Sequence, residues 1–334
     1  MVTSIPVQAT TTLTAHQLHF EGVVTSPVAM HPHKGSALRG MLFRALRGDE
    51  GAPGGFCVNR RESECHRCPY YALCPISALL ATVDPTSPRG INVPRPYTIE
   101  PPLGLETLLP PGAPFAFGLT LFASALNLFP YVIVGVRDME RGGVGLAIQG
   151  SDGRWRKGRF RLQRIVARNP LTRTEQVILQ EGDDLVQVPD VPITHAQLAA
   201  APAGGDEVTL EFLTPLRLVD GTRLVHTPDF RVIMHRLFER LEALAGHYAG
   251  EPLRFDRPAL LSLADQVALV QDETQWLDLA SYSGRRDVRT PIGGFVGRAT
   301  FRGPLAPFWP WLRWAEVVHV GKDTVKGNGW VRIR

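Results

Sequence analysis

The sequence predicts an α+β protein of two compact units, each a small antiparallel sheet with helices on one face. Its 334 residues suit two domains of ordinary size, each large enough to bury a core. Strand-like patterns of period two alternate with helical patterns of period 3.6 in both halves of the chain. A segment of small, flexible residues, 199–206, separates the halves. We therefore expect a first domain over residues 1–200 and a second over residues 206–334.

The chain is expected to begin with a strand and an amphipathic helix. Ala15–Ser26 alternates apolar and polar residues, as a half-buried strand does. Ser36–Arg47 predicts a helix, because its apolar residues recur at helical spacing and Gly48 can end it. The loop between these two elements carries three side chains that suit acid–base or phosphate chemistry: His31, His33 and Lys34.

All four cysteines lie within eighteen residues, at Cys57, Cys65, Cys68 and Cys74. A reducing cytosol disfavours disulfides between them. Four thiolates at such spacing can close a tetrahedral zinc site that folds an otherwise coreless insertion, here about residues 49–80. We expect a structural zinc ion, with an iron–sulfur cluster or unligated thiols as the alternatives.

The stretch Thr107–Val136 contains no charged residue and is long enough to cross a bilayer. Four prolines and the alternation of Phe115–Ala123 instead predict a buried strand, followed by a helix at Leu126–Met139. A further short strand is expected at Tyr97–Glu100. Because no secretory signal is visible either, the sequence predicts a soluble, cytoplasmic protein.

Residues 137–173 form a basic zone, with ten basic and three acidic side chains. A glycine turn at 141–145 leads into a predicted hairpin whose alternation places Arg159 and Arg161 on one face. Such one-sided charge favours contact with an RNA backbone, although a solvated edge strand protected by charge is the alternative. We expect RNA contacts from Arg156, Lys157, Arg159 and Arg161.

The second half repeats the alternation of strands and helices. A helix is expected to begin at Thr227 and Pro228 as cap and first residue, and another over Pro258–Val270 with Asp256 as its cap. The expected strands are Val208–Leu218, Trp276–Ser283, Gly294–Gly303, Val317–Val320 and Trp330–Ile333.

A second basic zone covers residues 284–334, with ten Lys or Arg against three Asp or Glu. Between the two zones, residues 175–278 carry seven basic and eighteen acidic side chains. The second zone ends in a glycine-rich run, in which glycine allows the backbone to approach a phosphate closely and lysine supplies counter-charge. We expect RNA contacts from Arg39 in the first helix and from Arg285, Arg286, His319, Lys322, Lys326, Gly327 and Gly329.

Several motifs, in their order along the chain, resemble those of the CRISPR RNA-processing endoribonucleases of the repeat-associated RAMP superfamily. They are Leu38-Arg39-Gly40, Pro94-Arg95-Pro96-Tyr97, Thr214-Pro215-Leu216-Arg217, Tyr282-Ser283, Gly293–Gly297 and Gly321–Gly329. The resemblance implies tandem ferredoxin-like, RRM-like domains, from whose minimal pattern the cysteine insertion in the first domain departs. It also implies processing of CRISPR repeat RNA with the mature guide RNA kept bound, and other effector subunits as further partners.

No paired carboxylates and no acidic cluster stand out in the sequence, so two-metal hydrolysis has little support. RNA can instead be cut by its own 2′-hydroxyl, if one group takes the proton, another protonates the leaving oxygen and a cation stabilises the phosphorane. The resemblance implies this metal-independent route, with 2′,3′-cyclic phosphate and 5′-hydroxyl products and no catalytic cofactor. We expect His33, or its neighbour His31, as general acid or base, and Lys34 near the scissile phosphate.

Two other functional classes remain open. One is a non-catalytic RNA-binding subunit of a CRISPR effector complex, and the other is a zinc-bearing nucleic-acid adaptor unrelated to CRISPR. Cleavage of repeat RNA without metal distinguishes the enzyme from both.

Overall fold

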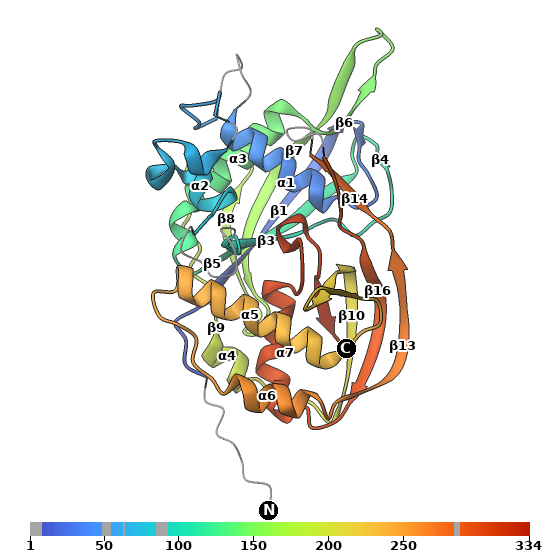
Figure 1. The fold of residues 1–334 in the computed structure, drawn as a ribbon. Helices are drawn as coiled ribbons and strands as arrows, with labels where there is room; N and C mark the ends of the chain where they lie inside the picture. Colours follow the sequence, from blue (N-terminus) through green and yellow to red (C-terminus); the bar gives the residue numbers. More distant parts are fainter. Residues whose placement is uncertain (1–8, 49–54, 63, 85–92, 284–287) are drawn as a thin grey trace, which may run out of the picture. The chain divides into compact units, whose positions relative to one another are not determined.

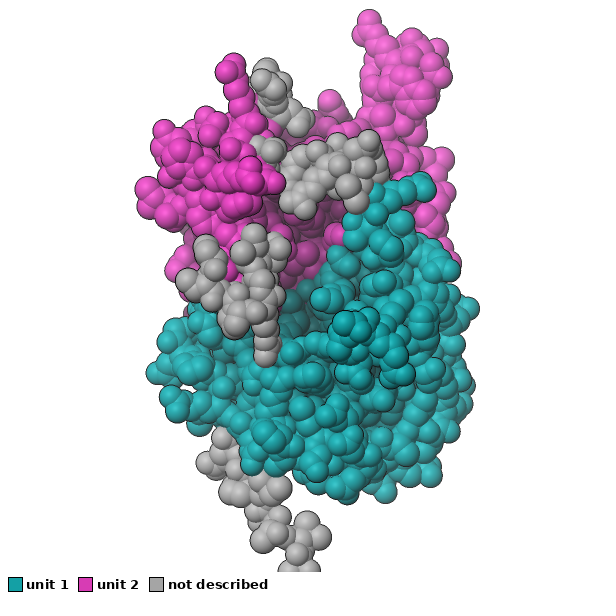
Figure 2. All heavy atoms as spheres, in the orientation of Figure 1, with its two compact units in different colours: residues 1–15, 193–324, 328–334 teal, residues 16–192, 325–327 magenta. Residues whose placement is uncertain are grey.

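Helices alternate with antiparallel strands throughout the computed structural model, which describes residues 9–48, 55–62, 64–84, 93–283 and 288–334 (Figure 1). This mixture confirms the predicted α+β class. Two units can be separated (Figure 2). Unit 1 comprises Met1–Ala15, Ile193–Thr324 and Asn328–Arg334, and unit 2 comprises His16–Pro192 and Val325–Gly327.

The sheet of unit 2 has the strand order β3-β5-β1-β7-β6-β2-β4, with β8 beside β7. Its pairings are antiparallel, and the long central strand β1 (Thr14–Ser26) buries Leu18 and Phe20 on one face. The other strands are β2 (Val28–Ala29), β3 (Tyr97–Glu100), β4 (Leu108–Leu109), β5 (Pro114–Phe122), β6 (Val144–Gln149), β7 (Trp155–Asn169) and β8 (Thr174–Gln180).

Two helices, α1 (Gly35–Arg47) and α3 (Phe129–Gly142), supply most of the helical core of unit 2. They approach closely at Gly135, where a Cβ would lie 2.9 Å from the Leu42 side chain. Each fully buried aliphatic side chain here stabilises the fold by roughly 1.5–3 kcal/mol. The remaining helical segments of this unit are α2 (Pro75–Leu80) and the 3₁₀ turns Cys65–Arg67, Tyr71–Leu73 and Ala123–Leu128.

Unit 1 contains a four-stranded antiparallel sheet of order β13-β16-β10-β17, with α5 and α7 on one face (Figure 1). Aromatic rings join the layers: Phe230 of α5 lies 5.4 Å from Phe301 of β16, and Phe238 lies 5.1 Å from Trp311 of α7. The elements are β9 (Ile193–Thr194), α4 (His195–Ala200), β10 (Glu207–Leu216), β11 (Leu218–Asp220), β12 (Arg223–Val225), α5 (Phe230–Tyr248), α6 (Arg257–Ala264), β13 (Ala268–Leu277), β14 (Ala280–Ser283), β15 (Val288–Pro291), β16 (Gly294–Arg302), α7 (Trp309–Val318) and β17 (Val331–Ile333). The 3₁₀ turns of this part of the chain are Ala306–Phe308 and Thr324–Lys326.

Besides the strand predicted at Trp276–Ser283, which is divided between β13 and β14, three predicted boundaries in the second half are wrong. Helix α5 starts at Phe230, because Asp229 rather than Thr227 accepts the capping hydrogen bond, from the Val232 amide. Helix α6 is capped by Asp256 as predicted but ends at Ala264.

The third error concerns Val317 and Val318, which were expected in a strand and instead end α7. Short apolar runs fit a buried strand and a buried helix equally well. Among the described residues, moreover, no helix combines the length and the apolar character needed to cross a membrane.

Candidate active site

The glycine-rich loop, residues 319–329, follows α7 and has an unusual backbone. Five of its residues have positive φ angles: His319 (59°), Gly321 (82°), Asp323 (60°), Gly327 (78°) and Gly329 (67°). Gly329 is required by space as well as by conformation, because a Cβ there would lie 1.8 Å from the Val320 carbonyl oxygen. The path of the loop therefore depends on five residues in the left-handed region of φ.

Three of the sequence motifs meet at the base of this loop, all within unit 1. The amides of Gly329 and Lys322 donate to the carbonyls of Pro215 and Arg217, at 3.0 and 3.1 Å. The Arg217 guanidinium donates in turn to the Gly293 carbonyl at 3.0 Å. Motifs far apart in the sequence thus form one hydrogen-bonded scaffold under the loop.

The tip of the loop, Val325–Gly327, counts with unit 2, where it lies against the start of α1. A Cβ on Gly35 would lie 1.9 Å from the Lys326 carbonyl oxygen, and one on Gly327 would lie 2.7 Å from the Pro101 ring. Among the described residues, no side chain caps α1 and no acidic residue occupies its first turn. Its free amide groups and the positive end of its dipole favour an anion at this end of the helix.

The three loop residues predicted for catalysis differ in exposure. His31 is exposed and His33 is half-buried, two residues before α1 begins. Lys34 is 1% exposed, and its amine donates to the Gly104 carbonyl. Burial lowers the pKa of Lys34, although the nearby Glu106 opposes the shift. A backbone carbonyl thus takes the Lys34 amine, and the place of Lys34 near the scissile phosphate stays a prediction.

His319, predicted to contact RNA, is 0% exposed. Its ring stacks on Trp330 at 5.9 Å and 14°. Burial first, and the Arg240 guanidinium second, lower the pKa of His319 to about 3. This assignment is therefore corrected: His319 is a neutral core residue.

The other predicted contacts in the loop divide by exposure. Gly327 and Gly329 are buried and packed against protein backbone or side chains, so their predicted RNA contacts are also wrong. Lys322 is exposed and Lys326 is half-buried, which leaves the two lysines as the cations of the loop. Arg285 and Arg286 lie outside the described residues.

The basic hairpin exists as predicted, and β6 with the start of β7 projects from the rest of unit 2 (Figure 1). Arg159 and Arg161 share the exposed face of β7, between buried Phe160 and Leu162. Exposed ion pairs join Arg161 to Glu181 at 3.1 Å and Arg156 to Asp152 at 2.5 Å. Such surface pairs contribute little to stability and can be exchanged for phosphate. Lys157 is half-buried beside them, whereas Arg39 lies in α1 with its guanidinium 5.3 Å from the Phe43 ring centroid.

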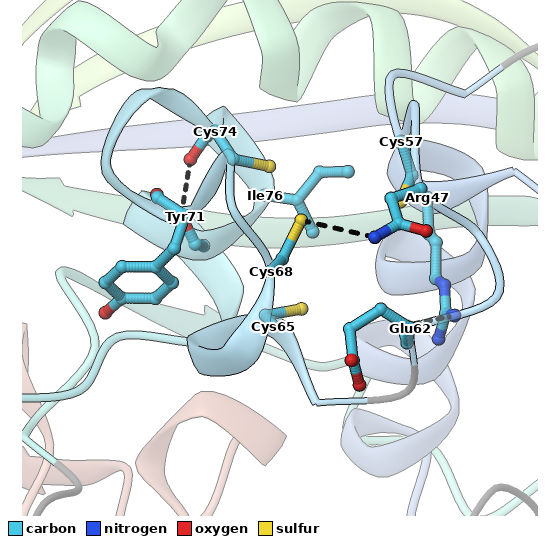
Figure 3. A pocket seen from close by; sticks show the side chains of 10 residues that line it. Arg47, Cys57, Glu62, Cys65, Cys68, Tyr71, Cys74 and Ile76 are labelled. Carbon is cyan, nitrogen blue, oxygen red and sulfur yellow. Dashed lines mark hydrogen bonds between the residues drawn. The ribbon is translucent and has the colours of Figure 1, made fainter.

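The four cysteines line one pocket in unit 2, together with Arg47 and Glu62 (Figure 3). All four are half-buried, and the Asn59 amide donates to the Cys68 sulfur at 3.8 Å. Four thiols around one pocket are a donor set that suits zinc. The distances between the side chains do not suit it, because no three Cys, His, Asp or Glu of the described residues stand close enough together to hold a metal ion.

Two residues important to the loop were not predicted. Asn328 is 0% exposed inside the loop, and Arg240 of α5 donates from its buried guanidinium to the Val318 carbonyl at 2.7 Å. Arg240 carried a signal, because it stands three residues after Leu237, on the apolar stripe of its helix, where a cation is unexpected. For Asn328, the sequence gives no signal beyond its place between two glycines.

Comparisons with known proteins agree with this geometry. A family model described as an N-terminal domain matches residues 13–191, and one described as CRISPR-associated endoribonuclease Cas6 matches residues 210–331. No curated protein matches the chain.

Solved structures of Cas6 proteins have the same fold over 96% of this chain. A Cas6 product complex matches with a TM-score of 0.54 and 18% identity, covering 100% of that chain. Thermus thermophilus Cas6 matches with 0.53 and 18%, covering 99% of that chain. A partial Cas6-RT-Cas1–Cas2 complex matches with 0.55 and 13%, covering 46% of that chain.

The first family model spans more than half of the sequence, and the second contains the loop scaffold described above. Residues 210–331, which contain this scaffold, thus match the CRISPR-associated endoribonuclease Cas6 family, and the chain has the fold of solved Cas6 proteins.

Proposed function

We propose that this protein cuts CRISPR repeat RNA by attack of a 2′-hydroxyl on the adjacent phosphate, and that it keeps the mature guide RNA bound. The products are a 2′,3′-cyclic phosphate and a 5′-hydroxyl. The observation that carries the proposal is the meeting, within unit 2, of the α1 N-terminus and the tip of the glycine-rich loop. A similar fold in a Cas6 product complex supports it.

In this proposal, His33 is the general acid or base, with His31 as the neighbouring candidate. A histidine suits the role because its ordinary pKa lies near neutrality. The positive end of α1 and the Lys326 side chain stabilise the extra negative charge of the phosphorane. Lys34 has a supporting role in this proposal, because its amine joins the start of α1 to the segment around Gly104.

We also propose that both units are ferredoxin-like. In unit 1 the order β10-α5-β13-β16-α7-β17 along the chain, with the strands arranged β13-β16-β10-β17, supports this assignment. In unit 2 the elements β1, α1, β3, β5, α3 and β7 repeat the pattern, with the strands arranged β3-β5-β1-β7.

A structural zinc ion held by Cys57, Cys65, Cys68 and Cys74 is a separate proposal, supported by the pocket that the four residues share. Zinc would draw these thiols into a tetrahedron and stabilise the insertion, and it would take no part in cleavage. Elemental analysis of protein from zinc-supplied cells should find about one equivalent. Absence of zinc with iron present would indicate the cluster instead, and absence of both would indicate unligated thiols.

The proposed function is tested by incubating the protein with repeat RNA in excess EDTA. Cleavage should proceed, and the upstream product should carry a cyclic phosphate. A substrate with a 2′-deoxy group before the scissile bond should bind but resist cleavage, because its nucleophile is missing. Cleavage of the deoxy substrate would contradict the mechanism, and tight binding of normal RNA without any cleavage would indicate a non-catalytic subunit.

A further inference from the structure

The glycine-rich loop contains a buried amide that no step of the proposed chemistry uses. Asn328 is 0% exposed, and its Nδ2 donates to the Ile292 carbonyl at 2.7 Å. Its backbone amide donates to the Asp323 carbonyl at 3.3 Å. These two bonds close the turn 323–328 and tie it to the connection between β15 and β16.

The loop has a strained backbone that such bonds help to fix. His319, before the turn, and Asp323, at its start, hold positive φ angles of 59° and 60° without being glycine, and that conformation is unfavourable for residues with a side chain. Strained backbone of this kind persists only where the surrounding structure fixes it. Here Asn328 fixes the loop from inside, while Arg240 fixes its first residues through the Val318 carbonyl.

The turn closed by Asn328 also carries Lys326, one of the two lysines of the loop. Lys326 lies two residues before Asn328, and its carbonyl is the atom that meets Gly35 of α1. A small displacement of the turn would therefore move this lysine. A displacement of about 1 Å in groups that orient a reacting centre can cost 10²-fold in rate.

We infer that Asn328 is a positioning residue for RNA cleavage: its side-chain hydrogen bond to Ile292 holds the turn that carries Lys326, the cation proposed for the phosphate. This inference rests on the proposed function. Asparagine suits the role because it is short enough to stay in the buried turn and has the N–H donor that the Ile292 carbonyl needs. Aspartate has the same shape but no donor while ionised, and alanine has neither.

The test compares Asn328→Asp and Asn328→Ala with the wild type in single-turnover cleavage at saturating repeat RNA. Both variants should lose about 10–10²-fold in rate, with RNA affinity changed by much less. Asn169→Asp is the matched control, because Asn169 is also buried, at 2% exposure, and also donates to a carbonyl, that of Pro192, at 2.8 Å. It should lose thermal stability as the Asn328 variants do, yet keep the wild-type rate.

A pH series separates the hydrogen bond from mere packing. Once the introduced carboxyl is protonated, it regains an O–H that can donate to the Ile292 carbonyl. The rate of Asn328→Asp relative to wild type should therefore rise as the pH falls, whereas that of Asn328→Ala should stay flat. Burial raises the pKa of the introduced carboxyl. Asp323 lies in the same turn, and His319, whose pKa is about 3, stays neutral well above that pH.

The inference is overturned if Asn328→Asp cleaves at the wild-type rate, or if Asn169→Asp loses as much rate at equal stability. It is also overturned if both Asn328 variants keep a flat ratio to wild type at all pH values, because packing alone would then explain the loss. A wild-type protein that does not cleave at all would instead contradict the proposed function.

Discussion

His33 is the residue on which the proposed chemistry depends most directly. Replacing it with alanine removes a proton-transfer group, and the imidazole ring that is lost is half-buried. Positioned acid–base groups contribute roughly 10²–10⁴-fold to a rate. We expect His33→Ala to lose about that much in single-turnover cleavage while repeat RNA still binds.

His31→Ala is the matched control for this prediction, because His31 lies two residues away and is exposed. If His31→Ala rather than His33→Ala loses the rate, the two histidines exchange roles. Full cleavage by the double variant would remove this loop from the mechanism.

His319 should make the stability of the protein depend on pH. Its folded pKa of about 3 lies below the ordinary 6.5, so the unfolded chain binds the proton more readily. The stability that the neutral His319 ring provides is complete above pH 6.5 and is lost as the pH falls from there toward 3. By pH 5 the loss should reach about 2 kcal/mol for this one histidine.

Urea unfolding at pH 7.5 and pH 5 measures this loss, and His319→Phe identifies its source. Phenylalanine keeps an aromatic ring against Trp330 but cannot titrate. The difference between the two pH values should shrink in the variant. An unchanged difference would assign the effect to other buried histidines, such as His19, whose burial lowers its pKa to about 4.

At the scale of elements, helix α1 contains two glycines with opposite surroundings. A Cβ on Gly35 would collide with the Lys326 carbonyl oxygen at 1.9 Å, whereas no described atom lies within 4 Å of one on Gly40. Gly40→Ala should therefore stabilise the helix by about 0.5–1 kcal/mol. Gly35→Ala should destabilise by roughly 1–3 kcal/mol, as overpacking does, and should impair cleavage.

Thermal unfolding of the two variants checks this prediction. If Gly35→Ala is as stable and as active as Gly40→Ala, the close contact between α1 and the loop does not exist in solution. If Gly40→Ala gains stability but loses RNA affinity, the open space beside Gly40 is where RNA packs.

The basic hairpin gives a second prediction at this scale. Reversing Arg159 and Arg161 to glutamate should weaken RNA binding and reduce the slope of log affinity against log salt by about 1–2, since each phosphate contact contributes about 0.7–0.9. Arg298→Glu with Arg302→Glu is the control, because these arginines also alternate on an exposed strand face, β16, and pair with Glu211 and Glu207. Equal effects of both double variants would mean that net charge alone is measured.

Elements with long, regular patterns could be predicted from the sequence, and their contacts could not. β1 and α1 agree with prediction to within a residue, because the local sequence itself contains the periods of two and 3.6 residues. The burial of His319 depends on α5 and Trp330, which no local pattern reveals. The burial of Lys34 was likewise not predicted, because its partner carbonyl at Gly104 lies seventy residues away.

At the scale of the whole molecule, the units are not consecutive in the sequence. Leu13 and Ala15, both buried, count with unit 1, although the rest of that unit begins at Ile193. Val325 packs against the hydrophobic core of unit 2, although the rest of that unit ends at Pro192.

This arrangement has a consequence for how the protein is made. As the chain leaves the ribosome, unit 2 lacks the segment Val325–Gly327 until all of residues 193–324 have been synthesised. The last side chain that packs against its core, that of Val325, is therefore made late. A gene cut at the 199–206 segment would yield two products, neither of which holds every residue of one unit, so we expect the halves to recover the native structure only when they are produced together.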